Sequence, residues 1–159
     1  MLHINVICVG KLKEQYLKEA CLEYKKRLSK YCLIDIIELA DEKIPDKLND
    51  KLSFEIKERE CKKILSNIKK DNYIISLDLK GKQFSSEEFS HKLETISFIN
   101  SSITFIIGGS LGLTNSVLEQ SNELVCFSKM TFPHQLIRVF LLEQIYRAFK
   151  ISNNESYHK

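Results

Sequence analysis

Three segments in the last third of the chain carry residues that could hold a ligand and move protons. They are Gly108-Gly109-Ser110-Leu111-Gly112-Leu113 after the apolar run 103–107, the segment Phe127 to Gln135, and the closing Tyr157-His158-Lys159. Glycine has no Cβ, so a glycine pair after a buried strand lets a ligand approach the backbone closely. Imidazole and phenol groups can accept or donate protons. We therefore expect the three segments to form one site.

The glycine pair has two interpretations. It lies where open α/β sheets bind ligands, beyond the carboxyl end of a strand. A tight turn uses glycine for the same conformational reason, so Gly108 and Gly109 alone do not distinguish a ligand loop from a turn. The chain has no G-x-G-x-x-G fingerprint and no G-x-x-x-x-G-K-[ST] phosphate loop. A Rossmann-like nucleotide-binding enzyme therefore has no motif to support it.

Two residues of the last predicted helix are candidates for catalysis. His134 follows Pro133 in the first helical turn, where the positive end of the helix dipole favours a neutral imidazole that can accept a proton. Arg138 lies one turn further on the same face, so both side chains could address one ligand. The alternatives are a capping or packing histidine and, for the arginine, a buried ion pair across an interface. The tail would fray by default, but its aromatic and imidazole groups suggest that it docks.

The elements that would position these residues alternate between strands and helices. Strands are expected at 2–9, 33–39, 73–79, 103–107 and 124–127, and helices at about 13–30, 50–70, from Ser85 onward, 114–121 and 133–150. Ser85 and Glu88 have the spacing of a capping box. The alternation predicts an α/β fold with a mainly parallel sheet flanked by helices, in a single domain over residues 1–159.

The last predicted helix is apolar on almost every side. Between Leu136 and Leu142 only Arg138 is polar, which indicates burial on more than one face. Packing against a second copy of the chain would supply that burial, so the pattern predicts a homodimer with this helix at the interface. The alternative is a helix buried wholly within its own chain.

Composition limits the remaining possibilities. The net charge is +3, and residues 1–70 hold 16 Lys/Arg against 12 Asp/Glu, which permits contact with a polyanion but is weaker than the basic stripes of many nucleic-acid-binding proteins. Five cysteines without a C-x-x-C pair, and no His, Cys, Asp or Glu cluster with metal-ligand spacing, predict free thiols in a cytoplasmic protein without a metal. No apolar run is long enough to span a membrane, and residues 2–9 resemble a strand rather than a signal peptide.

Motifs along nearly the whole chain resemble the small RlmH-type rRNA methyltransferases of the SPOUT superfamily. The matching segments are Val9-Gly10-Lys11-Leu12-Lys13, Glu23-Tyr24, Arg27-Leu28, Asp35-Ile36-Ile37-Glu38, Leu77-Asp78, Gly81-Lys82, Ile106-Ile107-Gly108-Gly109-Ser110, Phe127 to Gln135, Glu143-Gln144, Tyr146-Arg147-Ala148-Phe149 and Tyr157-His158. The long segment from Phe127 is the most specific of these. The chain departs from many relatives at Ser156, where they have proline, and at Leu111, where they often have a polar residue.

The resemblance implies a SPOUT-like fold with a C-terminal trefoil knot and a homodimer. It also implies methyl transfer from S-adenosyl-L-methionine, without a metal, to N3 of a pseudouridine in helix 69 of 23S rRNA on the assembled ribosome. The alternative is a non-catalytic ribosome-associated protein that retains the cofactor pocket. Motif by motif, the cofactor contacts would fall on Leu77, Gly108, Phe127, Ser128, Lys129, Met130, Thr131 and Phe132.

Loss of the N3 proton is the step for which the protein must provide chemistry. The candidates are His134, Tyr157 and His158 as proton acceptors or orienting groups, and Arg138 as a partner for an anion or phosphate. In a dimer, the tail of one subunit could complete the pocket of the other.

Overall fold

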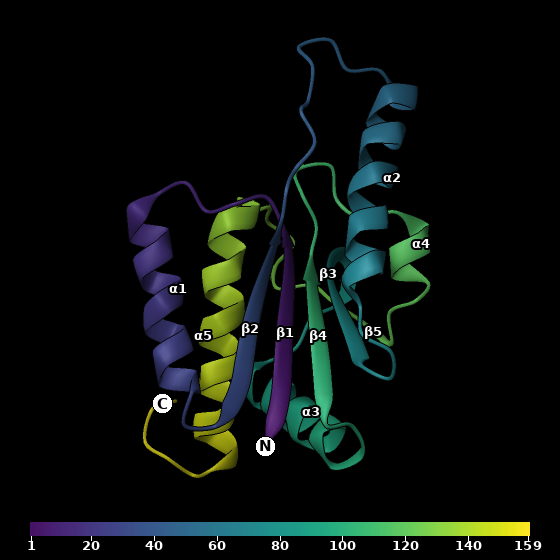
Figure 1. The fold of residues 1–159 in the computed structure, drawn as a ribbon. Helices are drawn as coiled ribbons and strands as arrows, with labels where there is room; N and C mark the ends of the chain where they lie inside the picture. Colours follow the sequence, from purple (N-terminus) through teal and green to yellow (C-terminus); the bar gives the residue numbers. More distant parts are fainter.

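Five parallel strands form the centre of the molecule in the computed structural model, which describes all residues 1–159 (Figure 1). The strands lie in the order β2-β1-β4-β3-β5. A parallel sheet needs a crossover between successive strands, and helices supply every crossover here. In chain order the elements are β1 Leu2–Val9, α1 Gln15–Leu28, β2 Cys32–Leu39, α2 Asp50–Asn67, β3 Tyr73–Lys82, α3 Ser86–Ile99, β4 Ser102–Ile107, α4 Asn115–Leu118, β5 Glu123–Val125 and α5 His134–Ser152.

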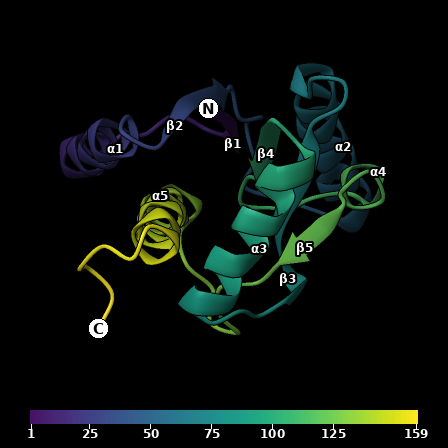
Figure 2. The same cartoon turned by 90° about the horizontal axis from the view of Figure 1, so that it is seen from below.

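Helices cover both faces of the sheet. Figure 2 shows α1, α5 and α3 on one face, with α5 between the other two, and α2 and α4 on the opposite face. Side chains of successive strand residues point to opposite faces, so β1 serves both layers. Its residues Ile4, Val6 and Cys8 belong to the larger core cluster, which includes α1, α3 and α5, whereas Ile7 and Val9 pack with α2 and α4. Two-sided burial explains why the central strands are apolar almost throughout.

The α/β fold with a parallel sheet confirms the prediction, and each expected strand and helix is present with ends shifted by a few residues. The capping box at the start of α3 is complete, because the Ser85 hydroxyl accepts from the Glu88 amide and the Glu88 carboxylate accepts from the Ser85 amide. The C-terminal trefoil knot remains a prediction. No helix of the structure is long and apolar enough to cross a membrane.

The apolar character of α5 has a cause within the chain. Leu141, Leu142, Ile145 and Ala148 are buried in the larger core cluster, where α5 packs against the sheet and has α1 and α3 as neighbours on either side. This burial accounts for much of the pattern from which a dimer was predicted. The homodimer therefore stays a prediction, for which other features must provide the support.

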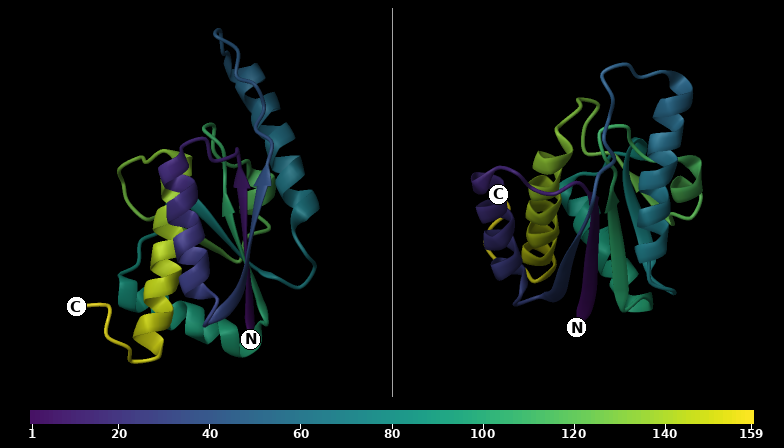
Figure 3. Two further views of the ribbon diagram at one scale, coloured as in Figure 1. Left: turned by 60° about the vertical axis from the view of Figure 1, so that its left-hand side comes forward. Right: turned by 45° about the horizontal axis from the view of Figure 1, so that its top comes forward.

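Because the strands are parallel, all five end at one edge of the sheet. The loop after β4 and the loop between β5 and α5 both lie at this carboxyl edge. The first turns of α2 and the segment 40–49 before it stand beyond the ends of the strands, as Figures 1 and 3 show. The loops after β4 and β5 and the projecting helix α2 thus lie at the same edge of the sheet.

Candidate functional site

A cavity of about 1020 Å³ lies at the carboxyl edge of the sheet. Its walls are the end of β3, the glycine loop, the segment between β5 and α5, and the face of α2. Seven of the eight predicted cofactor residues line it: Leu77, Gly108, Phe127, Ser128, Met130, Thr131 and Phe132. Lys129 belongs to the same loop but does not line the cavity. Two of the three segments that were expected to share a site therefore do so.

The glycine loop is both a tight turn and a wall of the cavity. Gly112 donates from its amide to the Gly109 carbonyl at 3.0 Å, and its φ of +82° is a conformation that residues with a side chain rarely adopt. A Cβ on Gly108 would lie 2.9 Å from Leu113 Cδ2 and 3.1 Å from the Gly112 carbonyl carbon. Glycine at position 108 is therefore required by the packing of the loop on itself.

The segment between β5 and α5 presents its backbone to the cavity. The Cys126 thiol donates to the Ser128 carbonyl at 3.0 Å, and the Ser128 hydroxyl accepts from the Met130 amide at 3.0 Å. The amides of Phe127 and Thr131 donate to no backbone carbonyl of the chain. Free amides between apolar side chains are suited to reading the polar edge of a flat heterocycle whose faces need apolar cover.

His134 begins α5 and lines the cavity. Its ring packs against Gly10, where a Cβ would lie 3.3 Å from Nε2. Burial lowers the pKa of His134 below 6.5, and the nearby Arg138 cation lowers it further. The imidazole is therefore neutral at neutral pH and able to accept a proton, as the sequence predicts.

Arg138 is fully buried and connects α5 to Glu38 of β2 and to Gly10 after β1. Its Nη1 pairs with Glu38 Oε2 at 2.6 Å, and its Nη2 donates to the Gly10 carbonyl at 2.9 Å. Glu38 also accepts from the Leu12 amide at 2.9 Å. With no exposed surface, the guanidinium could meet an anion only after leaving Glu38, so this arrangement matches the alternative of a buried ion pair, but formed within one chain rather than across an interface.

Replacing Arg138 with methionine is expected to lower the free energy of unfolding by about 2–4 kcal/mol, because Glu38 and the Gly10 carbonyl lose a buried charged partner. Denaturant unfolding followed by circular dichroism measures this change. Arg27→Met is the matched control, since the Arg27–Glu23 pair is exposed on α1 and should contribute little. Equal stability of the two variants would contradict the assignment.

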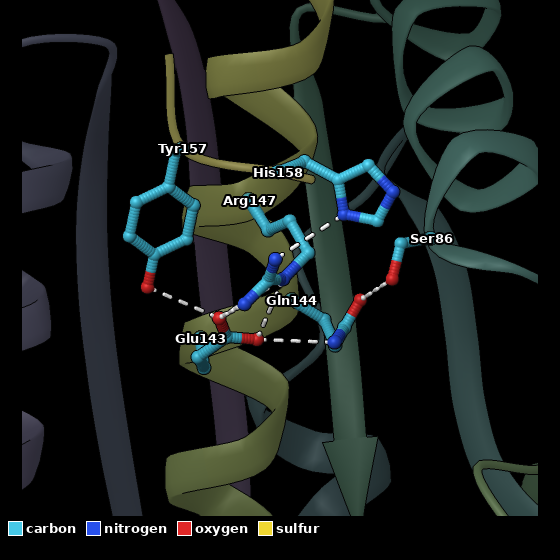
Figure 4. A network of polar contacts seen from close by, with 6 residues as sticks. All are labelled: Ser86, Glu143, Gln144, Arg147, Tyr157 and His158. Atoms are coloured by element: carbon cyan, nitrogen blue, oxygen red, sulfur yellow. Dashed lines mark hydrogen bonds and ion pairs between the residues drawn. The ribbon is translucent and has the colours of Figure 1, made fainter.

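The tail docks on its own chain (Figure 4), and none of its residues lines the cavity. The Tyr157 hydroxyl donates to Glu143 Oε1 at 3.1 Å, and the Arg147 guanidinium lies 4.7 Å from the centre of the Tyr157 ring. His158 places Nδ1 3.2 Å from Arg147 and Nε2 2.6 Å from Glu87 at the start of α3. The predicted docking of the tail is present, but within one chain it does not join the other two segments.

These contacts change how the tail residues can act. Burial, Tyr24 and the Glu143 carboxylate raise the pKa of Tyr157 to about 12, so its phenol is neutral and a hydrogen-bond donor at neutral pH. The Glu143–Arg147 pair forms across one turn of α5 and also holds the tail, since Glu143 accepts from Tyr157 and Arg147 contacts His158. Proton acceptance by Tyr157 would therefore require the tail to leave this position.

Three residues of α2 that the sequence did not indicate also line the cavity: Phe54, Lys57 and Glu58. No motif marks them, because their contribution depends on how α2 crosses the carboxyl edge. A fourth, Glu60, is buried beneath the glycine loop, and a Cβ on Gly109 would lie 3.0 Å from its Oε1. Burial raises the pKa of this carboxyl.

A family described as "Predicted SPOUT methyltransferase" matches residues 2–158 of the chain. The protein named "Ribosomal RNA large subunit methyltransferase H" from Clostridium acetobutylicum is 60% identical over 159 residues, which cover 99% of this chain and 100% of that protein. The protein of the same name from Clostridium perfringens strain 13 is 57% identical with the same coverage.

Two solved structures share the fold at low sequence identity. A probable methylase family protein from Haemophilus influenzae aligns with a TM-score of 0.57 at 13% identity, covering 98% of this chain and 70% of that one. A TrmH/SpoU tRNA modifying enzyme from A. aeolicus gives a TM-score of 0.52 at 10% identity, over 94% and 77% of the two chains. These likenesses support the fold alone.

Proposed function

The chain belongs to the SPOUT methyltransferase family and is a methyltransferase, and we propose that it methylates N3 of a pseudouridine in helix 69 of 23S rRNA on the assembled ribosome. The observation that carries this proposal is 54–60% identity along the full chain to proteins named as methyltransferases of large-subunit rRNA. These names favour an enzyme over a ribosome-associated protein without catalysis. Ribosomes as substrate imply a cytoplasmic location.

S-Adenosyl-L-methionine is the proposed methyl donor, and the cavity fits it. Gly108 lines the cavity in a loop that has no room for a side chain there, the Phe127 and Thr131 amides have no other acceptor, and the Leu77 and Phe132 side chains offer apolar cover. The donor supplies a methyl group already activated on a sulfonium, so the protein needs neither a metal nor a covalent intermediate. The structure has no group of three or more His, Cys, Asp and Glu residues that could hold a metal ion.

The nucleophile must lose its N3 proton as the new N–CH₃ bond forms and the C–S bond of the donor breaks. His134 is the predicted proton acceptor that lines the cavity, and it is kept neutral by burial and by Arg138. We assign it the role of accepting or relaying this proton. Arg138 lies one turn further along α5 than His134, and Glu38 of β2 holds it in place. We therefore assign Arg138 the role of a positioning residue.

Tyr157 and His158 would contribute from a second subunit. Met130, which lines the cavity, exposes 74% of its surface, and Phe140 exposes 37% and packs edge-on against the cavity residue Phe132, with ring centres 5.4 Å apart. Exposed apolar side chains beside an incomplete site support a homodimer that covers them. In that assembly, the tail of one subunit would lie over the cavity of the other.

Mass spectrometry of 23S rRNA tests the proposed function directly. Ribosomes that lack the modification are incubated with the protein and S-adenosyl-L-methionine, and the helix 69 fragment is expected to contain N3-methylpseudouridine. Omitting the methyl donor is the control. If an active reference enzyme modifies these ribosomes while this protein leaves them unchanged, the proposed substrate is wrong.

A further inference from the structure

We propose that the part of the cavity lined by α2 binds a nucleobase of the RNA substrate, stacked on the Phe54 ring, with Lys57 contacting a neighbouring phosphate. This inference rests on the proposed rRNA methyltransferase function and assigns residues that contact the substrate. It concerns a wall of the cavity that none of the predicted cofactor residues forms.

The cavity has room for more than a methyl donor. Its volume of about 1020 Å³ is at the upper limit of the roughly 300–1,000 Å³ usual for small-molecule sites. The cofactor residues belong to β3, the glycine loop and the segment before α5, whereas α2 supplies a separate wall. Polar side chains of Ser110 and Asn115 line the cavity as well. A second reactant could therefore lie beside the donor, between the glycine loop and α2.

Phe54 does not contribute to the hydrophobic core. Ile56, Cys61 and Ile64 of the same helix face the core and are each at most 1% exposed, whereas Phe54 is 58% exposed and belongs to neither core cluster. It lies in the second turn of α2, where the helix projects beyond the strands (Figure 1). An exposed aromatic ring that lines a cavity next to a reaction site is suited to stacking on a base.

Two charged residues on the same face of α2, Lys57 and Glu58, would orient the RNA. Lys57 and Glu58 follow Phe54 by three and four residues, so the three side chains share one face, and all three line the cavity. Lys57 forms no ion pair, whereas its neighbours Arg59 and Lys63 both pair with Glu42. The free ammonium attracts a phosphate, while the Glu58 carboxylate repels phosphate and accepts hydrogen bonds from base N–H groups.

An unpaired RNA base fits this wall better than a protein side chain does. Sequence-specific RNA recognition acts on splayed bases of loops and bulges, which stack on aromatic rings, and such stacking contributes about 1–3 kcal/mol per base. The net charge of the chain is only +3, which is small for a protein that attracts an RNA duplex by charge alone. This small charge also favours recognition of a single unpaired base.

Kinetics with unmodified ribosomes test the proposal. Phe54→Leu keeps an apolar side chain without the ring and is expected to raise KM for ribosomes on the order of tenfold. Calorimetry should show an unchanged Kd for S-adenosyl-L-methionine, and Phe54→Tyr should restore KM. Phe98→Leu is the matched control, because Phe98 is 80% exposed on α3 near the opposite edge of the sheet.

The outcomes separate this inference from the function on which it depends. If the wild-type protein modifies ribosomes and Phe54→Leu has an unchanged KM, the base site is wrong while the proposed function stands. A weaker Kd for the methyl donor would also overturn the inference, because Phe54 would then belong to the cofactor site. Absence of methylation by the wild type would instead reject the proposed function.

A second measurement does not depend on rates. With p-azidophenylalanine in place of Phe54, ultraviolet light is expected to cross-link the protein to 23S rRNA in unmodified ribosomes, at nucleotides mapped by reverse-transcription stops. The same group in place of Phe98 should give no such stops. Cross-links from position 54 to ribosomal proteins alone, or equal cross-linking from both positions, would contradict the proposal.

Discussion

Gly108→Ala is expected to weaken binding of S-adenosyl-L-methionine by about 10- to 100-fold and to abolish methylation at ordinary donor concentrations. The new Cβ would lie 2.9 Å from Leu113 Cδ2 and 3.1 Å from both the carbon and the oxygen of the Gly112 carbonyl. Backbone atoms cannot rotate away as a side chain can, so the loop itself must shift, at a cost of about 1–3 kcal/mol. Titration calorimetry with the purified protein measures the change in Kd.

Gly112→Ala provides a control within the same loop. No atom lies within 4 Å of a Cβ at this position, but the φ of +82° disfavours alanine by about 1 kcal/mol. Its effect on donor binding should therefore be clearly smaller than that of Gly108→Ala. Equal losses would mean that strain in the turn, rather than the space at Gly108, limits binding.

His158→Ala is expected to reduce the rate of methylation at least about 100-fold while leaving the Kd for S-adenosyl-L-methionine unchanged. The Kd should not change because His158 lies outside the cavity of its own chain, against Arg147 and Glu87. The rate should fall because His158 would meet the substrate from a partner subunit. Single-turnover methylation of unmodified ribosomes measures the rate, and calorimetry measures donor binding.

Mixing two inactive variants tests whether the tail acts across a dimer. Subunits with Gly108→Ala keep a normal tail, and subunits with His158→Ala keep a normal cavity. After unfolding and joint refolding, half of the dimers are mixed, and each contains one intact combination if the tail acts on its partner, which gives about a quarter of wild-type activity. If the tail acts on its own chain, the mixture stays inactive.

Local patterns were sufficient to predict the elements of the fold. The spacing of apolar residues located every strand and helix, and Ser85 with Glu88 marked the start of α3 correctly, because capping depends on neighbours in the chain. The spatial order of the strands was not predicted, since it depends on contacts between distant segments.

The candidate site was only partly predictable for the same reason. Gly108 and the segment from Phe127 could be placed in one cavity because both follow strands of one parallel sheet. The partner of Arg138 is Glu38, 100 residues away, and no spacing rule connects them. Phe54 was missed as well, since an aromatic residue on an amphipathic helix predicts a core position.

The sequence predicted that the tail docks, but it did not predict where. The aromatic and imidazole groups of Tyr157 and His158 indicated docking, and both side chains make specific contacts. The site where His158 docks depends on Glu87 at the start of α3, which is 71 residues away and which no spacing rule connects to the tail.

The position of α5 between α1 and α3 governs when the protein can fold during its synthesis. Central strands β1 and β4 pair across about 100 residues of chain, and the part of the apolar face between α1 and α3 remains uncovered until α5 is made. α5 follows all five strands of the sheet in the chain. A nascent chain that lacks this segment exposes apolar surface and parallel strands, which favours aggregation and chaperone binding. The core is thus completed by a helix that is synthesised after every strand it packs against.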